Sequence, residues 1–236
     1  MSLSPTDRIY VALDTPDVNK AVALAEQLAG HVGGVKLGME FYYANGPEGA
    51  RAVSAVGMPL FLDLKFHDIP NTVAGAVRST LALNPAILNV HAQGGPEMMR
   101  AAQGALDDAN GAKPLLIAVT VLTSLSDEDL GETGYTLGAA DLVTRLAKLT
   151  QSCGLGGVVC SPREIKAIRA ACGPDFKLIV PGIRPEWAAV GDQKRITTPA
   201  QAISDGADYI VIGRPITGAD DPLDAAKRIA DELSAL

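Results

Sequence analysis

Eight short hydrophobic runs rich in β-branched residues recur along the chain, and longer amphipathic, Ala-rich stretches separate most of them. The runs predict strands at residues 9–13, 35–39, 60–66, 87–92, 115–122, 157–160, 177–181 and 209–213. The stretches between them predict helices at residues 18–29, 72–83, 97–109, 141–152, 164–171 and 200–204, with an extra short helix at 127–130. Strand and helix therefore alternate along the whole sequence.

This alternation predicts the fold class. Near-continuous apolar strands indicate a parallel sheet covered by helices, and eight such units close into an α/β fold, the (β/α)8 or TIM barrel. A doubly wound open sheet is the alternative, but no G-x-G-x-x-G motif follows the first strand. The chain of 236 residues also matches the roughly 200–250 residues of one α/β barrel, so we expect a single domain over residues 1–236.

Composition and charge narrow the classes of partner. With 47% hydrophobic and 20% charged residues, the chain is typical of a folded globular protein rather than a disordered one. Its 20 Lys and Arg against 27 Asp and Glu give a net charge of −7, which repels a polyanionic backbone. We therefore expect no nucleic acid partner, although a few local cations can still hold a small anion.

The cysteines and the N-terminal sequence indicate the cellular setting. Cys153, Cys160 and Cys172 lack C-x-x-C spacing, which favours neither a disulfide framework nor a zinc site and predicts a reducing, cytoplasmic location. The N-terminal residues have no apolar leader, and no stretch approaches the roughly 18 apolar residues of a membrane span. Neither export nor a membrane anchor is expected.

Candidate chemistry concentrates in residues 61–72, which read FLDLKFHDIPNT. Alternation along a strand places Asp63 and Lys65 on one face and Leu62, Leu64 and Phe66 on the other. The charged face must be the barrel interior, since the apolar face meets the helices. A lysine among carboxylates stays protonated, so Lys65 is a candidate proton donor. The alternative is an internal ion pair with a purely structural role.

Two further charges extend this pattern, since Asp14 ends the first predicted strand and Lys36 interrupts the second. With Asp63 and Lys65 they predict a row of alternating charge across three adjacent strands. In such barrels the active site lies at the carboxyl ends of the strands. Asp14 could instead simply cap the helix that follows it.

The chain also contains a candidate anion site and a candidate lid. Gly213 and Arg214 follow the eighth predicted strand, where barrels commonly bind phosphate. Residues 182–198, which include Arg184 and Gln193, predict a lid over a ligand, with a solvated loop as the alternative. No histidine has metal-ligand spacing, and no H-E-x-x-H, G-x-S-x-G or Walker motif occurs, which argues against metalloprotease, serine hydrolase and P-loop chemistry.

Over essentially its whole length the chain resembles the orotidine 5′-phosphate decarboxylase family. The matching strings are VALD at 11–14, VKLG at 35–38, FLDLKFHDIPNT at 61–72, NVHA at 89–92, VTVLTS at 119–124, VPGIRP at 180–185, GDQKR at 191–195 and IGRP at 212–215. The third string is highly specific and the last is not. Related sugar-phosphate decarboxylases and hexulose-phosphate synthases share a D-x-K-x-x-D element but lack its I-P-N-T continuation and the Q-K-R loop.

The resemblance implies a cytoplasmic lyase that decarboxylates orotidine 5′-monophosphate to UMP in pyrimidine biosynthesis, without a cofactor. It makes Lys65 the donor of a proton to C6 of the pyrimidine and places Asp63 beside the substrate carboxylate. It also implies a homodimer in which Asp68, Ile69 and Thr72 reach into the partner's site.

The remaining roles that the resemblance implies concern binding of the nucleotide. Asp14 and Lys36 would hold the ribose hydroxyls, Thr123 and Gln193 would contact the pyrimidine, and Arg184, Gly213 and Arg214 would serve the phosphate. Two alternatives remain open at this point, a Mg²⁺-dependent sugar-phosphate lyase of the same barrel type and a non-catalytic ribonucleotide-binding barrel.

Overall fold

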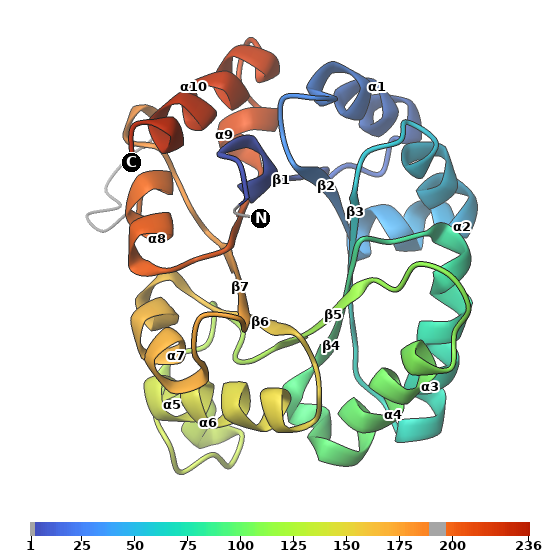
Figure 1. The fold of residues 1–236 in the computed structure, drawn as a ribbon, viewed down its shortest axis with the longest axis vertical. Helices are drawn as coiled ribbons and strands as arrows, with labels where there is room; N and C mark the ends of the chain where they lie inside the picture. The colour runs from blue at the N-terminus through green and yellow to red at the C-terminus, as the bar shows by residue number, and fades with distance from the viewer. Residues whose placement is uncertain (1–2, 189–196) are drawn as a thin grey trace.

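In the computed structural model, which describes residues 3–188 and 197–236, parallel strands close into a barrel surrounded by helices (Figure 1). The strands are β1 (Ile9–Ala12), β2 (Gly34–Gly38), β3 (Leu60–Phe66), β4 (Ile87–His91), β5 (Leu115–Val119), β6 (Gly157–Val159), β7 (Lys177–Pro181) and β8 (Tyr209–Ile212). The last strand pairs with the first, with Ile212 opposite Val11. The predicted eight-stranded barrel is therefore confirmed.

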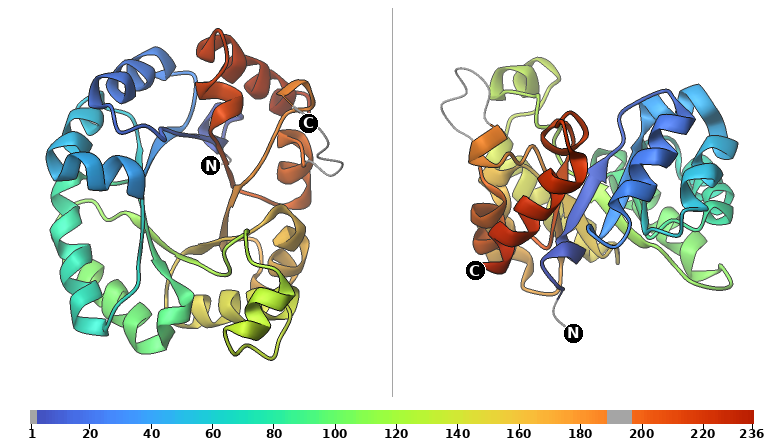
Figure 2. Two further views of the ribbon diagram at one scale, coloured as in Figure 1. Left: turned by 180° about the vertical axis from the view of Figure 1, so that it is seen from behind. Right: turned by 90° about the horizontal axis from the view of Figure 1, so that it is seen from above.

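The helices form a ring around the strands, as the left view of Figure 2 shows. They are α1 (Val18–Leu28), α2 (Met39–Ser54), α3 (Pro70–Thr80), α4 (Gly95–Asp107), α5 (Asp127–Glu132), α6 (Ala139–Ser152), α7 (Ile165–Cys172), α8 (Pro199–Asp205), α9 (Arg214–Thr217) and α10 (Pro222–Ser234). Short 3-10 turns are η1 (Thr6–Arg8), η2 (Leu81–Leu83), η3 (Ala92–Gly94), η4 (Pro162–Glu164) and η5 (Glu186–Ala188). In the described ranges, no helix is long and apolar enough to cross a membrane.

Three helices were not predicted from the sequence pattern, namely α2, α9 and α10. Helix α2 is interrupted by Gly46, whose φ is 62°, and by Pro47, so its apolar period breaks in the middle. Proline inside a helix removes a backbone hydrogen bond and kinks it. The short helix 127–130 was predicted and is present as α5, which Ser126 and Asp129 cap reciprocally.

The barrel has two apolar layers, which follow from the two faces of each strand. Outward residues such as Leu62 and Leu88 pack under the helices in the main core. Inward residues, including Phe61, Ile87 and Ile117, fill the barrel interior. Since inward positions recur every second residue, Phe61 and Ile87 are followed toward the carboxyl ends by the polar inward residues Asp63 and Asn89. The apolar interior therefore forms a floor beneath the polar mouth of the barrel.

Candidate active site

Four charged side chains at the carboxyl ends of β1, β2 and β3 form a continuous row. Lys36 Nζ lies 3.3 Å from Asp14 Oδ1 and 3.4 Å from Asp63 Oδ2. Lys65 Nζ donates a hydrogen bond to Asp63 Oδ1 at 2.7 Å. The row alternates in sign, as the sequence pattern predicts.

Strand register explains why these side chains meet. Gly38 of β2 lies opposite Asp63 of β3, and Ala12 of β1 lies opposite Lys36. Asp63, and Asp14 two residues beyond Ala12, therefore lie one inward step nearer the carboxyl ends than Lys36, and the long Lys36 side chain extends to contact both carboxylates. The alternative role for Asp14 as a helix cap is wrong, because Asp17 caps α1 by accepting from the Lys20 backbone N–H.

Burial and charge act in opposite directions on Asp63, which is only 8% exposed. Burial raises the pKa of its carboxyl, but the ammonium groups of Lys36 and Lys65 and the hydrogen bonds from Lys65 and Asn89 outweigh it and lower the pKa overall. Asp63 is therefore ionised at neutral pH. A negative charge held in a buried position between two cations is a preorganised electrostatic environment.

Strand β3 departs from regular alternation at Lys65. The pairing of β3 with β4 shifts register between Leu62 and Phe66, and Lys65 has a φ of 53° in the left-handed region. This corrects the expectation of unbroken period-two alternation through residue 66. Non-glycine residues in that region are strained and concentrate at functional sites.

Sequence reasoning did not assign roles to two polar residues of β4, Asn89 and His91. Asn89 is fully buried and His91 is 9% exposed. In the described part of the chain, His91 Nδ1 is the one buried side-chain polar atom without a hydrogen-bond partner. Alternation along the strand could have indicated them, because Asn89 and His91 are two and four residues beyond the inward-facing Ile87 and so share its face.

The electrostatic setting of His91 differs from that of an exposed histidine. Its ring lies 5.5 Å from that of His67, centroid to centroid. Burial, followed by the nearby His67 and Lys65, lowers the pKa of His91 to about 4. His91 is therefore neutral at physiological pH and adds no positive charge to the mouth of the barrel.

Asp68, Ile69 and Thr72 lie at the start of α3, on the surface of the chain. Ile69 is 67% exposed, which is unusual for a large apolar residue. Within the described residues, the ion pair of Lys65 is with Asp63 and does not include Asp68. Residues 61–72 thus place Asp63 and Lys65 at the barrel mouth and Asp68, Ile69 and Thr72 on the surface.

Apart from Gln193, the residues assigned to the phosphate and the pyrimidine follow strand ends at the same mouth. Gly213 adjoins the charged row, because a Cβ added there would lie 3.8 Å from Asp14 Oδ2. Arg214 begins the short helix α9, and the Arg184 backbone N–H donates to the Thr197 carbonyl at 3.1 Å. A cavity of about 680 Å³ at the ends of β5, β6 and β7 is lined in part by Thr123.

Gln193 and the central part of the predicted lid lie outside the described residues. Residues 182–188 and 197–198 of that segment are described. There the Arg228 guanidinium stacks over the Trp187 ring, with its Cζ 4.1 Å from the ring centroid. This contact attaches the described part of the segment to α10.

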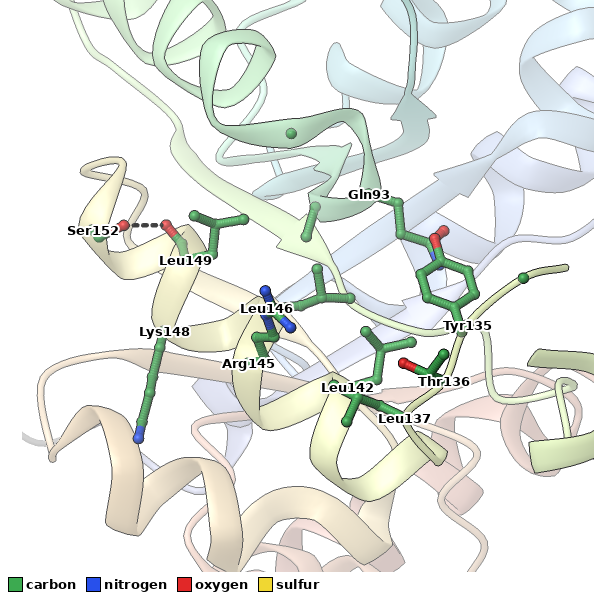
Figure 3. Close-up of a pocket in the computed structure, with 13 residues that line it drawn as sticks. Gln93, Tyr135, Thr136, Leu137, Leu142, Arg145, Leu146, Lys148, Leu149 and Ser152 are labelled. Atoms are coloured by element: carbon green, nitrogen blue, oxygen red, sulfur yellow. Dashed lines mark hydrogen bonds between the residues drawn. The ribbon is translucent and has the colours of Figure 1, made fainter. Parts of the chain in front are cut away.

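A second cavity, of about 730 Å³, lies away from this chemistry (Figure 3). Helix α6 supplies one wall, including Leu142, Arg145 and Leu149, and the loop with Tyr135 supplies another. None of the four charged residues of the row lines it. Over the described ranges, no group of three or more His, Cys, Asp and Glu side chains is arranged to hold a metal ion.

A closed parallel barrel with ionised side chains at the carboxyl ends of its strands defines the class of (β/α)8-barrel enzymes. The chain belongs, more narrowly, to the Orotidine 5′-phosphate decarboxylase / HUMPS family, whose model matches residues 7–229.

Individual relatives match over almost the full length. A Paramagnetospirillum magneticum protein named orotidine 5′-phosphate decarboxylase is 55% identical over 229 residues, covering 95% of this chain and 97% of that protein. A Rhodospirillum rubrum protein of the same name is 56% identical over 230 residues, covering 95% and 93%. The crystal structure of orotidine 5′-phosphate decarboxylase from Lactobacillus acidophilus is 38% identical with a TM-score of 0.85, covering 95% of this chain and 98% of that one.

Proposed function

We propose that this protein decarboxylates orotidine 5′-monophosphate to UMP and CO2, the final step of de novo UMP biosynthesis. Family membership and the names of near-full-length relatives support this carboxy-lyase activity. The observation that carries the proposal is the row of alternating charge, in which Lys65 Nζ lies 2.7 Å from the buried carboxylate of Asp63 at Oδ1. A binding protein has no need of a protonated lysine held in this way.

The reaction needs both charge stabilisation and a proton. Loss of CO2 breaks the bond between the carboxyl carbon and C6 and leaves the electron pair on C6, where no ring carbonyl is placed to delocalise it. The Lys65 ammonium stabilises this developing charge and then transfers a proton to C6. The resulting amine regains its proton from water, so the residue returns to its starting state.

Asp63 favours departure of CO2 in this scheme. Its carboxylate lies beside the substrate carboxylate, and their repulsion is relieved as the latter becomes neutral CO2. Lys36 keeps Asp63 ionised and, with Asp14, binds the ribose hydroxyls. The proposal includes no metal or organic cofactor, and Lys36, Asp63, Lys65 and Asp68 are its catalytic group.

The rest of the nucleotide is bound around the mouth. Arg184, Gly213 and Arg214 bind the phosphate, while Thr123 and Gln193 contact the pyrimidine. Binding energy from the phosphate, remote from C6, can then contribute to the chemical step through closure of the segment 182–198.

The proposed assembly is a cytoplasmic homodimer of single barrel domains. Asp68, Ile69 and Thr72 of each subunit complete the site of its partner, so each site has carboxylates from both chains near Lys65. The exposure of Ile69 and the absence of Asp68 from the described ion pairs of Lys65 support this arrangement.

The first experiment is the absorbance change when purified, EDTA-treated protein is mixed with orotidine 5′-monophosphate, with UMP identified as the product. We expect rapid conversion that added Mg²⁺ does not change. Turnover that depends on Mg²⁺ would contradict the proposed chemistry and favour a sugar-phosphate lyase. Tight UMP binding without conversion would favour a non-catalytic binding barrel.

Sharing of the site between subunits is tested by mixing Lys65→Ala with Asp68→Asn. Each variant alone is expected to be inactive, because every site of its homodimer carries the defect. After subunit exchange, a heterodimer has one doubly defective site and one intact site, so about a quarter of the wild-type sites should return in a random equal mixture. No recovery in a mixture proven to exchange would contradict shared sites.

A further inference from the structure

We propose that Asn89 is a positioning residue that fixes the proton donor Lys65 and the carboxylate of Asp63 in a single geometry. This inference rests on the proposed decarboxylase function. Asn89 belongs to none of the groups assigned above to the substrate, and it acts through the two residues that it binds.

The contacts of Asn89 join the two reacting groups. Its Oδ1 accepts a hydrogen bond from the Lys65 backbone N–H at 2.8 Å, and its Nδ2 donates to Asp63 Oδ1 at 2.7 Å. The same Asp63 oxygen accepts from Lys65 Nζ. One buried amide therefore holds the main chain of the proton donor and the side chain of its counter-ion together.

The break in the β3–β4 pairing explains why an amide is needed. Between Leu62 and Phe66 the two strands fall out of register, so the Lys65 N–H has Asn89 Oδ1 as its partner in place of a strand carbonyl. A buried N–H without a partner is costly, and the left-handed φ of Lys65 adds strain. The Asn89 amide compensates for both, because its oxygen accepts from the Lys65 N–H while its NH2 group donates to Asp63.

Asn89 is itself rigidly placed. It is fully buried in the middle of β4, and its backbone position pairs with Ile117 of β5. Its side chain thus projects inward from a regular part of the barrel to hold an irregular part. Without it, the Asp63 carboxylate can rotate and the Lys65 main chain can relax, and both move Lys65 Nζ away from the position that proton transfer needs.

The test compares wild type with Asn89→Leu, which keeps the approximate volume and removes both hydrogen bonds. We expect kcat to fall roughly 100-fold, the effect of about 1 Å of misplacement at a reacting centre. The Kd for UMP should stay within about threefold, because Asn89 is assigned no contact with the nucleotide. Thr150→Val is the matched control, since it removes a fully buried side-chain hydrogen bond, from Thr150 Oγ1 to the Leu146 carbonyl, far from the mouth.

Asn89→Asp supplies a readout that a merely structural role would not move. At neutral pH the introduced carboxylate still accepts from the Lys65 N–H but repels Asp63, so kcat should be low. On acidification the introduced carboxyl takes up a proton and donates to Asp63, so kcat relative to wild type should rise between pH 8 and pH 5. Asn89→Leu should show no such recovery, and Thr150→Val should match wild type throughout.

The outcomes separate this inference from the proposed function. A folded Asn89→Leu protein with kcat within threefold of an active wild type would overturn the inference alone. If that variant fails to fold, an Asn89→Asp profile parallel to wild type would overturn it instead. Wild-type protein that does not convert orotidine 5′-monophosphate would overturn the proposed function, and the inference with it.

Discussion

Replacing Lys36 by methionine removes the central cation of the charged row with little change in shape. Lys36 Nζ lies 3.3 Å from Asp14 Oδ1 and 3.4 Å from Asp63 Oδ2, and the Lys36 and Asp63 side chains are 11% and 12% exposed. At an effective dielectric constant of roughly 20, a pair 3.4 Å apart gains about 5 kcal/mol, and desolvation offsets much of that.

The expected loss of stability depends on the partners that Asp63 retains in the variant. Removing one partner of a buried pair typically costs about 3–5 kcal/mol. Asp63 retains Lys65 and Asn89, so we expect Lys36→Met to lower the free energy of unfolding at pH 7 by roughly 2–3 kcal/mol. Urea unfolding followed by circular dichroism measures this difference.

The pH dependence of the variant gives an independent check. Because the pKa of folded Asp63 is below its ordinary value, its contribution to stability is present at neutral pH and is lost as pH falls through the folded pKa. Without Lys36, Asp63 loses one of the charges that lower its pKa, so that pKa rises. The acid-unfolding midpoint should therefore move to higher pH.

Lys113→Met is the control, since it also changes net charge by one unit. Its exposed ammonium donates only to the Asp107 carbonyl within the described structure, so we expect a change within about 0.5 kcal/mol. If Lys36→Met matched this control in both stability and acid midpoint, the charged row would not stabilise the ionised form of Asp63, and the reasoning would be refuted.

Two further predictions concern Lys65 and His91. Lys65 has a φ of 53°, so Lys65→Gly should be more stable to urea than Lys65→Ala by about 1 kcal/mol, the reverse of the usual order in strands, and equal stabilities would exclude backbone strain there. The pKa of His91 is about 4 when folded, below its ordinary 6.5, so the unfolded chain binds more protons between these values. The free energy of unfolding should therefore rise with pH across that window by up to about 3 kcal/mol. His91→Gln should reduce this pH dependence, and an unchanged dependence in the variant would show that other groups cause it.

The barrel could be predicted from sequence because each strand is buried on both faces. Such strands appear in the sequence as nearly continuous apolar runs. Helix α2 was missed because Gly46 and Pro47 interrupt its period, although packing against the sheet still holds both halves. Strand β5 ends at Val119, three residues before the predicted end, since an apolar run carries no signal for where strand pairing stops.

The charged row could be predicted because it depends on two regular properties, alternation along a strand and alignment of parallel strand ends. Asn89 could not be assigned in the same way. Its role arises because the backbone of Lys65, 24 residues away in sequence, departs from the regular strand conformation. The sequence gives no reason to expect a left-handed backbone at Lys65, because lysine disfavours that conformation.

The barrel therefore uses regularity and irregularity for different parts of one task. The in-register strands β1, β2 and β3 place Asp14 and Asp63 one inward step nearer the carboxyl ends than Lys36, whose side chain reaches both carboxylates. Residues two apart in a regular strand lie about 6.6 Å apart along it, so side chains on one face run parallel. The left-handed backbone at Lys65 allows its ammonium to reach back to Asp63. The buried amide of Asn89 on the neighbouring strand stabilises this conformation by accepting the Lys65 N–H. The strained backbone of Lys65 is thus held by a side chain from a fully buried position on a regularly paired strand, which is where a preorganised site has to be anchored.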